Sequence, residues 1–158
     1  MKTMQWYLDK YGESHQNKTN KTIHWICVPI IVFTLAGMLF SVPFPFSAEK
    51  NALFNWTAPI FIVALLFYVT KSIPIFIGMF IYSALVLLGN QWLYEALGQS
   101  NGKLALVSFG IFALAWVFQF KGHQIEGKKP SFLEDMKFLL IGPAWLLHFI
   151  YKKLNINY

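Results

Sequence analysis

The chain has 158 residues, of which 56% are hydrophobic and 13% are charged. A soluble domain is typically about 45–50% apolar and about 25% charged, and a chain this short cannot bury so much apolar surface in one globule, so an ordinary soluble domain is excluded. The net charge of +6 comes from lysine alone, because the sequence contains no arginine, and this argues against a nucleic-acid partner.

The N-terminal segment, residues 2–14, predicts an amphipathic helix that lies on the membrane surface. Its apolar side would be formed by Met4, Trp6, Tyr7, Leu8 and Tyr11. The segment lacks the apolar core of a cleavable signal peptide, so we expect the first hydrophobic run to stay in place as an anchor.

Four apolar runs follow, at residues 23–42, 52–69, 73–94 and 104–120. Each approaches the roughly 20 helical residues that cross a hydrocarbon core about 30 Å thick. A shorter run, residues 139–151, predicts an interfacial or re-entrant helix. The sequence therefore predicts an all-α fold, an integral membrane helical bundle of about four transmembrane helices in a single domain, residues 1–158.

Lysine is distributed unequally between the two predicted membrane faces. With four spans, both termini and the turn at Lys71 share one face, and of the thirteen lysines only Lys50 and Lys103 lie on the other. The positive-inside rule then predicts cytoplasmic termini, in a bacterial inner membrane or the endoplasmic reticulum. A re-entrant hairpin in place of spans two and three would keep the crossing number even but bury Lys71, at about 2.5–3.5 kcal/mol, so four spans are favoured.

Three of the four histidines lie in two polar segments that adjoin apolar runs, residues 15–24 before the first run and residues 119–130 after the last. An even number of crossings places both segments on the same membrane face. His15 and His24, nine residues apart, would point in opposite directions on one continuous helix, so they can converge only if the helix breaks between them.

The break is predicted near Thr19 and Asn20, which are suitable N-caps for a helix that begins near Lys21. In the second segment, His123 and Glu126 are three residues apart and therefore share a helical face, and Gly127 and Pro130 then end the helix.

Three imidazoles and one carboxylate would suit non-haem iron(II), whose sites combine these ligands with open positions, and zinc accepts the same ligands. Simpler interpretations remain open at this point. Each histidine can be a polar residue at headgroup depth, Glu126 a solvated surface charge, and Asn17 and Asn20 helix caps. His148 fits an interfacial polar residue better than a ligand.

Residues 11–29 resemble the first signature of the 2-hydroxy fatty acid dioxygenase family, and residues 119–130 resemble the second. Gly142-Pro143 is also similar, so the resemblance covers essentially the whole chain. Cys27 and Lys121 replace a usual glycine and a usual apolar residue, and the acidic residue expected after Gly142-Pro143 is not evident. The resemblance implies iron(II)-dependent α-oxidation, in which dioxygen shortens a 2-hydroxy long-chain fatty acid by one carbon.

The resemblance also implies roles for individual residues. His15, His24 and His123 would be metal-binding and catalytic, Glu126 a further ligand, and His148 a candidate extra ligand. The substrate would be bound by Asn17, Lys18, Asn20, Lys21, Lys128 and Lys129, with its acyl tail between the spans and membrane lipid around it. An oligomer is compatible with these expectations.

A different class of function is left open by the sequence, a non-enzymatic membrane protein that binds lipid or acts as a scaffold. The di-iron sites of membrane desaturases and hydroxylases need many more histidines than the four present here, so this class of enzyme is excluded.

Overall fold

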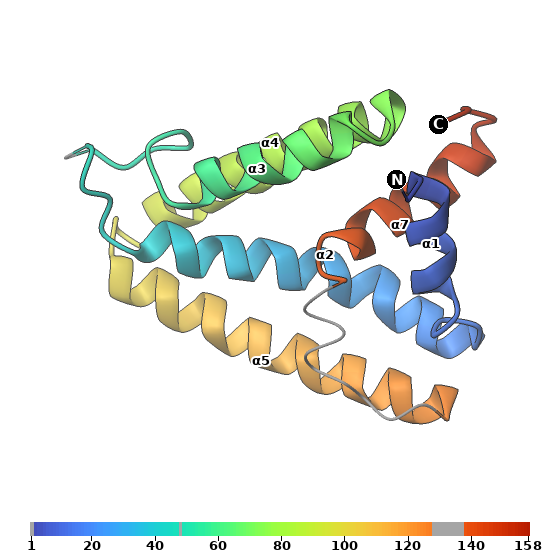
Figure 1. Ribbon diagram of the computed structural model, residues 1–158. Helices are drawn as coiled ribbons and strands as arrows, with labels where there is room; N and C mark the ends of the chain where they lie inside the picture. The colour runs from blue at the N-terminus through green and yellow to red at the C-terminus, as the bar shows by residue number, and fades with distance from the viewer. Residues whose placement is uncertain (1, 48, 128–137) are drawn as a thin grey trace.

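The computed structural model describes residues 2–47, 49–127 and 138–158, and within these ranges all regular structure is helical, which confirms the predicted all-α fold. Figure 1 shows a bundle of long helices with two shorter helices at one end. The helices are α1 (Met4–Gly12), α2 (Lys18–Ser41), α3 (Thr57–Val69), α4 (Ile73–Ala96), α5 (Asn101–Glu126) and α7 (Ile141–Lys153).

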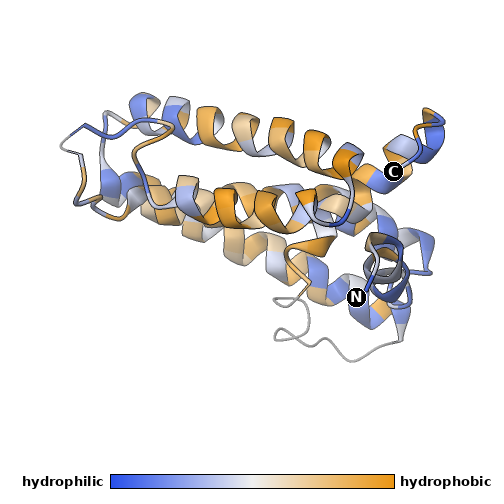
Figure 2. Ribbon diagram, turned by 45° about the horizontal axis from the view of Figure 1, so that its top comes forward, coloured by the Kyte–Doolittle hydropathy of each residue, from blue (hydrophilic) through white to orange (hydrophobic). Residues whose placement is uncertain are grey.

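Three of these helices are long and apolar enough to cross a membrane, namely α2, α4 and α5, with 24, 24 and 26 residues. Most of their length is hydrophobic (Figure 2). The protein is therefore a helical membrane protein, as predicted. The second predicted span, α3, has only 13 residues, which is about 20 Å of helix and less than the hydrocarbon thickness of about 30 Å.

The late start of α3, at Thr57 instead of near residue 52, has a local cause. The Asn51 side chain accepts hydrogen bonds from the backbone of Leu53 and Phe54 at 2.9 and 3.1 Å. The Asn55 side chain then accepts hydrogen bonds from the two backbone N–H groups that open α3. Asparagine side chains compete with helical backbone bonds in this way, so residues 51–56 form a bent segment in front of the helix.

The chain nevertheless passes between the two ends of the bundle four times. The Thr57 hydroxyl donates to the Ala36 carbonyl in the second half of α2, which places the start of α3 far from the N-terminus. The Lys71 ammonium, in the α3–α4 turn, donates to the Lys2 carbonyl at 3.1 Å, so that turn lies beside the N-terminus (Figure 1). The start of α2 and the end of α5 therefore share this end of the bundle, as predicted.

This end, called here the lysine-rich end, holds most of the lysines that the structure describes. Lys50 instead contacts the Ser41 carbonyl and Asn101 at the opposite end, where Lys103 also lies. The lysines of the lysine-rich end are Lys2, Lys10, Lys18, Lys21, Lys71, Lys121, Lys152 and Lys153.

Helix α1 differs from its prediction as a helix on the membrane surface, because its apolar side is covered by protein. Met4, Leu8 and Tyr11 are buried in one cluster with Trp145 of α7, whereas Trp6 is 39% exposed. α7 is thus mostly a packing partner of α1 and α4, and the two short helices close the lysine-rich end.

The main helix pair, α2 and α5, packs tightly near the histidines. A methyl group on Gly122 of α5 would overlap the Asn20 amide oxygen on α2. We expect Gly122→Ala to lower the free energy of unfolding by about 1–3 kcal/mol, the usual cost of an added group in a filled space.

Gly110→Ala is the matched control on the same helix, because a methyl group there meets nothing within 4 Å. Its better helix propensity should raise stability by up to about 1 kcal/mol. Thermal unfolding of both variants in detergent checks this expectation, and equal unfolding temperatures would show that the approach at Gly122 is unimportant.

Candidate metal centre

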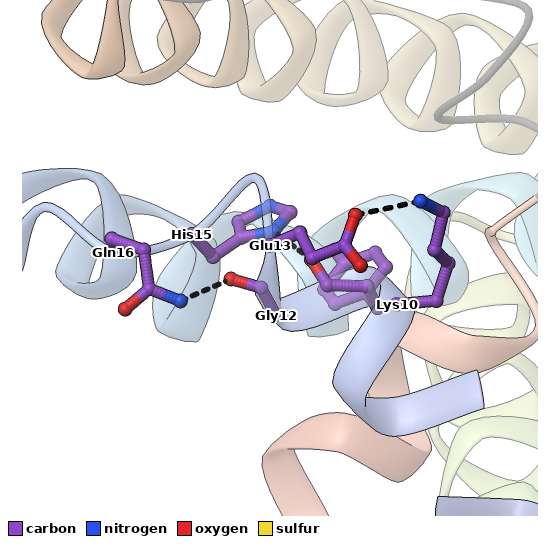
Figure 3. A network of polar contacts seen from close by, with 6 residues as sticks. Lys10, Gly12, Glu13, His15 and Gln16 are labelled. Carbon is purple, nitrogen blue, oxygen red and sulfur yellow. Dashed lines mark hydrogen bonds and ion pairs between the residues drawn. The ribbon is translucent and has the colours of Figure 1, made fainter. Parts of the chain in front are cut away.

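The turn between α1 and α2 brings His15 back towards the bundle. The backbone N–H of His15 donates to the Gly12 carbonyl at 3.0 Å, and the Gln16 amide donates to the same carbonyl at 2.6 Å. Figure 3 shows this turn, in which Lys10 also pairs with Glu13 at 2.6 Å. The predicted break between the two histidines is therefore present.

The break lies earlier than predicted. α2 begins at Lys18 and its N-cap is Asn17, whose side-chain oxygen accepts hydrogen bonds from the backbone N–H groups of Thr19 and Asn20. The prediction of a helix start near Lys21, capped by Thr19 or Asn20, was wrong because Asn17 is an equally good cap that comes first.

His123 lies inside α5, because this helix continues to Glu126, six residues beyond the predicted end of the fourth run at residue 120. Gly127 then adopts a left-handed conformation with φ of 75° and ends the helix, as its sequence position predicted. His123 and Glu126 thus share one end of α5.

The three histidines meet at this end. His15, His24 and His123 are 2%, 1% and 4% exposed. Their ring centroids are 4.2 Å apart for His15 and His24, 5.0 Å for His24 and His123, and 5.5 Å for His15 and His123. One nitrogen of each ring lies within 4.8 Å of the others. We call these three residues the histidine cluster.

Two backbone carbonyls define the tautomer of two neutral imidazoles in this cluster. Nδ1 of His15 lies 2.7 Å from the Tyr11 carbonyl, and Nδ1 of His24 lies 3.0 Å from the Asn20 carbonyl. A carbonyl oxygen can only accept, so each Nδ1 must carry the proton, and Nε2 keeps the lone pair that can bind a metal. Metal-binding histidines are commonly oriented by such a hydrogen bond.

Aromatic side chains cover the cluster at His15. The Tyr11 ring stacks on His15 with centroids 4.3 Å apart and planes 13° apart, and the Trp145 ring lies 5.3 Å from His15. A methyl group on Gly142, in the first turn of α7, would come within 3.3 Å of the Tyr11 hydroxyl, so α7 packs tightly here. These rings limit the access of water to His15.

Glu126 lies beside the cluster, and its carboxylate binds the α1–α2 turn. One oxygen accepts from the Gln16 backbone N–H at 2.8 Å, and the other accepts from Asn17 N–H at 2.9 Å and the Asn20 amide at 3.1 Å. Glu126 is not among the residues whose ligand atoms gather within 4.8 Å. Its role as a ligand stays a prediction, and its hydrogen bonds favour another role.

The predicted substrate-binding residues are spread over the same turn. Asn17 is the helix cap, and Asn20 is fully buried and also donates to the Ser14 carbonyl at 3.1 Å. Lys18 is exposed and Lys21 half-buried in the first turn of α2. The two remaining candidates, Lys128 and Lys129, lie outside the described residues.

His148 lies apart from the cluster. A hydrogen bond joins its Nδ1 to the Tyr158 hydroxyl near the C-terminus. Burial lowers the pKa of His148, the charge of Lys152 lowers it further, and Asp9 raises it. It is not among the histidines that could share an ion, so the structure gives no support to its candidacy as an extra ligand.

Sequence reasoning missed three residues at the site, namely Tyr11, Trp145 and Gln119. Gln119 is buried one helical turn before His123 on the same face of α5. A polar residue four positions before a candidate ligand is a usable sequence signal, whereas the contacts of Tyr11 and Trp145 depend on how α7 packs.

The histidine cluster fits a divalent transition metal. Three neutral imidazole nitrogens on a shared centre are ligands of iron(II) and zinc alike. Two nitrogens bound at about 2.1 Å to one ion can be at most about 4.2 Å apart. The observed limit of 4.8 Å is close to this separation.

A helical membrane bundle with three buried histidines gathered at its lysine-rich end defines a membrane protein with a candidate metal centre. Comparison with known sequences places it more closely. The chain belongs to the Mpo1-like family, because the sequence model described as "2-hydroxy-palmitic acid dioxygenase Mpo1-like" matches residues 1–154. The resemblance inferred from the two signatures is thereby confirmed.

A relative in Saccharomyces cerevisiae, the 2-hydroxy-palmitic acid dioxygenase MPO1, is 28% identical over 145 residues, which cover 90% of this chain and 76% of that protein. No solved structure gives a significant match.

Proposed function

We propose that this protein is an iron(II)-dependent dioxygenase that shortens 2-hydroxy long-chain fatty acids by one carbon. The observation that carries the proposal is the burial of His15, His24 and His123 against one another in a member of the Mpo1-like family. The name of the yeast relative supports the same substrate class.

Each part of the site has a task in this proposal. His15, His24 and His123 hold the metal through Nε2, and the carbonyls of Tyr11 and Asn20 keep two of the rings in the required tautomer. Iron(II), when bound, supplies the reactivity towards dioxygen. The overall reaction balances when one 2-hydroxy acid and one dioxygen give the shorter acid, carbon dioxide and water.

The position of the cluster suits an amphiphilic substrate. It lies where α2 and α5 reach the lysine-rich end, between the apolar bundle and the charged surface (Figures 1 and 2). Lys18 and Lys21 attract the substrate carboxylate from the surface, and the acyl tail stays in the apolar layer. An aliphatic tail loses no favourable contact there, because its surroundings remain apolar.

The test is turnover by the purified protein. In detergent, with iron(II) and dioxygen, we expect 2-hydroxypalmitate to be converted to pentadecanoate and palmitate to remain unchanged. A stable lipid complex without turnover in the presence of bound iron would instead support the non-enzymatic lipid-binding alternative. Loading the metal-free protein with zinc in place of iron should abolish turnover, because zinc is not redox-active.

We further propose that the lysine-rich end faces the cytoplasm, on the positive-inside rule. Cysteine substitutions at Lys71 and Lys103, which lie at opposite ends of the bundle, test this orientation with a membrane-impermeant maleimide. In intact cells or sealed vesicles of known orientation, only the cysteine at position 103 should react from outside. The reverse labelling pattern would invert the orientation.

A further inference from the structure

Two cavities lie in line with the histidine cluster, towards the middle of the bundle. The first has a volume of about 20 Å³ and is lined in part by Tyr11, Val28 and Gln119. Tyr11 stacks on His15. Val28 and Gln119 are each one helical turn from His24 and His123, on the same helix faces. The first cavity therefore adjoins the cluster.

The second cavity is larger, about 120 Å³, and lies among α2, α3 and α4. Its lining is almost entirely aliphatic and aromatic, with Val32 and Leu39 on α2, Ala64 on α3 and Met79 on α4. Leu139 lines both cavities. Leu139 thus lies between the first cavity, next to the histidine cluster, and the second cavity inside the bundle.

We propose that these two cavities, called here the tail channel, hold the acyl tail of the 2-hydroxy fatty acid and set its preferred length. This inference rests on the proposed function, since it takes the substrate head to be at the histidine cluster. The first cavity lies next to the head, and the buried amide of Gln119 lines it. Leu139 forms the constriction between the cavities.

Distance along α2 supports a long-chain occupant. Val32 and Leu39 follow His24 by 8 and 15 residues, which is about 12 and 22 Å along a helix. One leaflet of acyl tails fills half of a hydrocarbon core about 30 Å thick, so one long tail reaches about 15 Å. A long-chain 2-hydroxy acid anchored at the cluster therefore ends in the second cavity, and a much shorter acid does not reach it.

A bulky residue in the second cavity should shorten the preferred substrate. Ala64 is half-buried on α3 and lines this cavity, so Ala64→Phe fills it without entering the histidine cluster. We expect a loss of about tenfold or more in kcat/KM for 2-hydroxypalmitate, the size of an overpacking penalty, and almost no change for 2-hydroxydecanoate. Ala113→Phe, on the exposed face of α5, is the matched control and should change neither value.

Binding gives a readout that does not depend on turnover. A 2-hydroxy fatty acid with a diazirine at its terminal carbon should label peptides of α2 and α3 around Val32, Leu39 and Ala64. An excess of unlabelled 2-hydroxypalmitate should abolish this labelling but leave background labelling of the exposed Leu106 and Phe109 unchanged. Bound iron should be equal in wild type, Ala64→Phe and Ala113→Phe.

The outcomes separate the two proposals. The first outcome is turnover by the wild type, a chain-length profile that Ala64→Phe leaves unchanged, and labelling outside the two cavities. This outcome would overturn the tail channel and leave the proposed function standing. Competed labelling at the second cavity without any turnover would support the channel and contradict the dioxygenase. Membrane phospholipid should displace the label less effectively than 2-hydroxypalmitate does. Equal displacement would show a general lipid site and overturn the channel as a substrate determinant.

Discussion

His24→Ala should lose nearly all bound iron and all measurable turnover of 2-hydroxypalmitate. His24 is 1% exposed, and its ring contacts both other rings of the histidine cluster. Loss of a partner that only orients a ligand typically weakens metal binding by about 10–100-fold, so loss of a ligand should cost about 100-fold or more. Iron per protein, measured by elemental mass spectrometry after reloading with a known amount of iron(II), checks this expectation.

His148→Ala is the matched control for this experiment. It removes an imidazole that is 6% exposed, so both variants lose a comparable amount of buried surface. His148 bonds to Tyr158 and lies outside the histidine cluster, and we expect its variant to bind iron as the wild type does. Iron retained by His24→Ala, or lost equally from both variants, would contradict the assignment of the cluster as the metal site.

Much of the fold is readable from the sequence because apolar runs and their breaks are local properties. The extent of α4 and the shared end of the two polar segments follow from counting apolar residues and lysines. The start of α3 does not, since it depends on the side chains of Asn51 and Asn55, which take over backbone hydrogen bonds that a span would use itself. Asparagine can either cap a helix or interrupt one, so its presence in the sequence does not define where α3 begins.

The candidate site divides in the same way. The meeting of His15 and His24 is predictable, because only a break between them lets two residues out of phase converge. The stacking of Tyr11 on His15 and the approach of Trp145 are not, since they depend on α7 packing against α1. The amphipathic pattern of α1 predicted a position on the membrane surface and did not predict this contact with α7. Such a pattern shows that one side of a helix is apolar but not what covers that side.

Glu126 is the residue for which sequence and structure suggest different roles. Its spacing from His123 suggested a metal ligand, but its two carboxylate oxygens accept three hydrogen bonds from Gln16, Asn17 and Asn20. These bonds join the end of α5 to the turn that carries His15. We therefore propose that Glu126 is a positioning residue, which keeps His15 and His123 in register by holding the turn against α5.

Glu126→Ala should then lower the free energy of unfolding of the metal-free protein by about 2 kcal/mol. This value is near the lower end of the usual range for hydrogen bonds to a charged group, because the site is partly exposed. Iron affinity should fall by about 10–100-fold, as for other residues that orient ligands. Glu95→Gln, which alters a carboxylate at the other end of the bundle that accepts from Gln91 at 2.9 Å, should change neither quantity.

The two roles of Glu126 give opposite patterns in these measurements. A metal ligand contributes little to the protein without metal, so its loss would leave metal-free stability unchanged and reduce iron affinity by more than about 100-fold. A positioning residue contributes to stability with and without metal, because its partners are the backbone N–H groups of Gln16 and Asn17. Unfolding of the metal-free variant, followed separately from iron titration, therefore decides whether the carboxylate binds the metal or the turn.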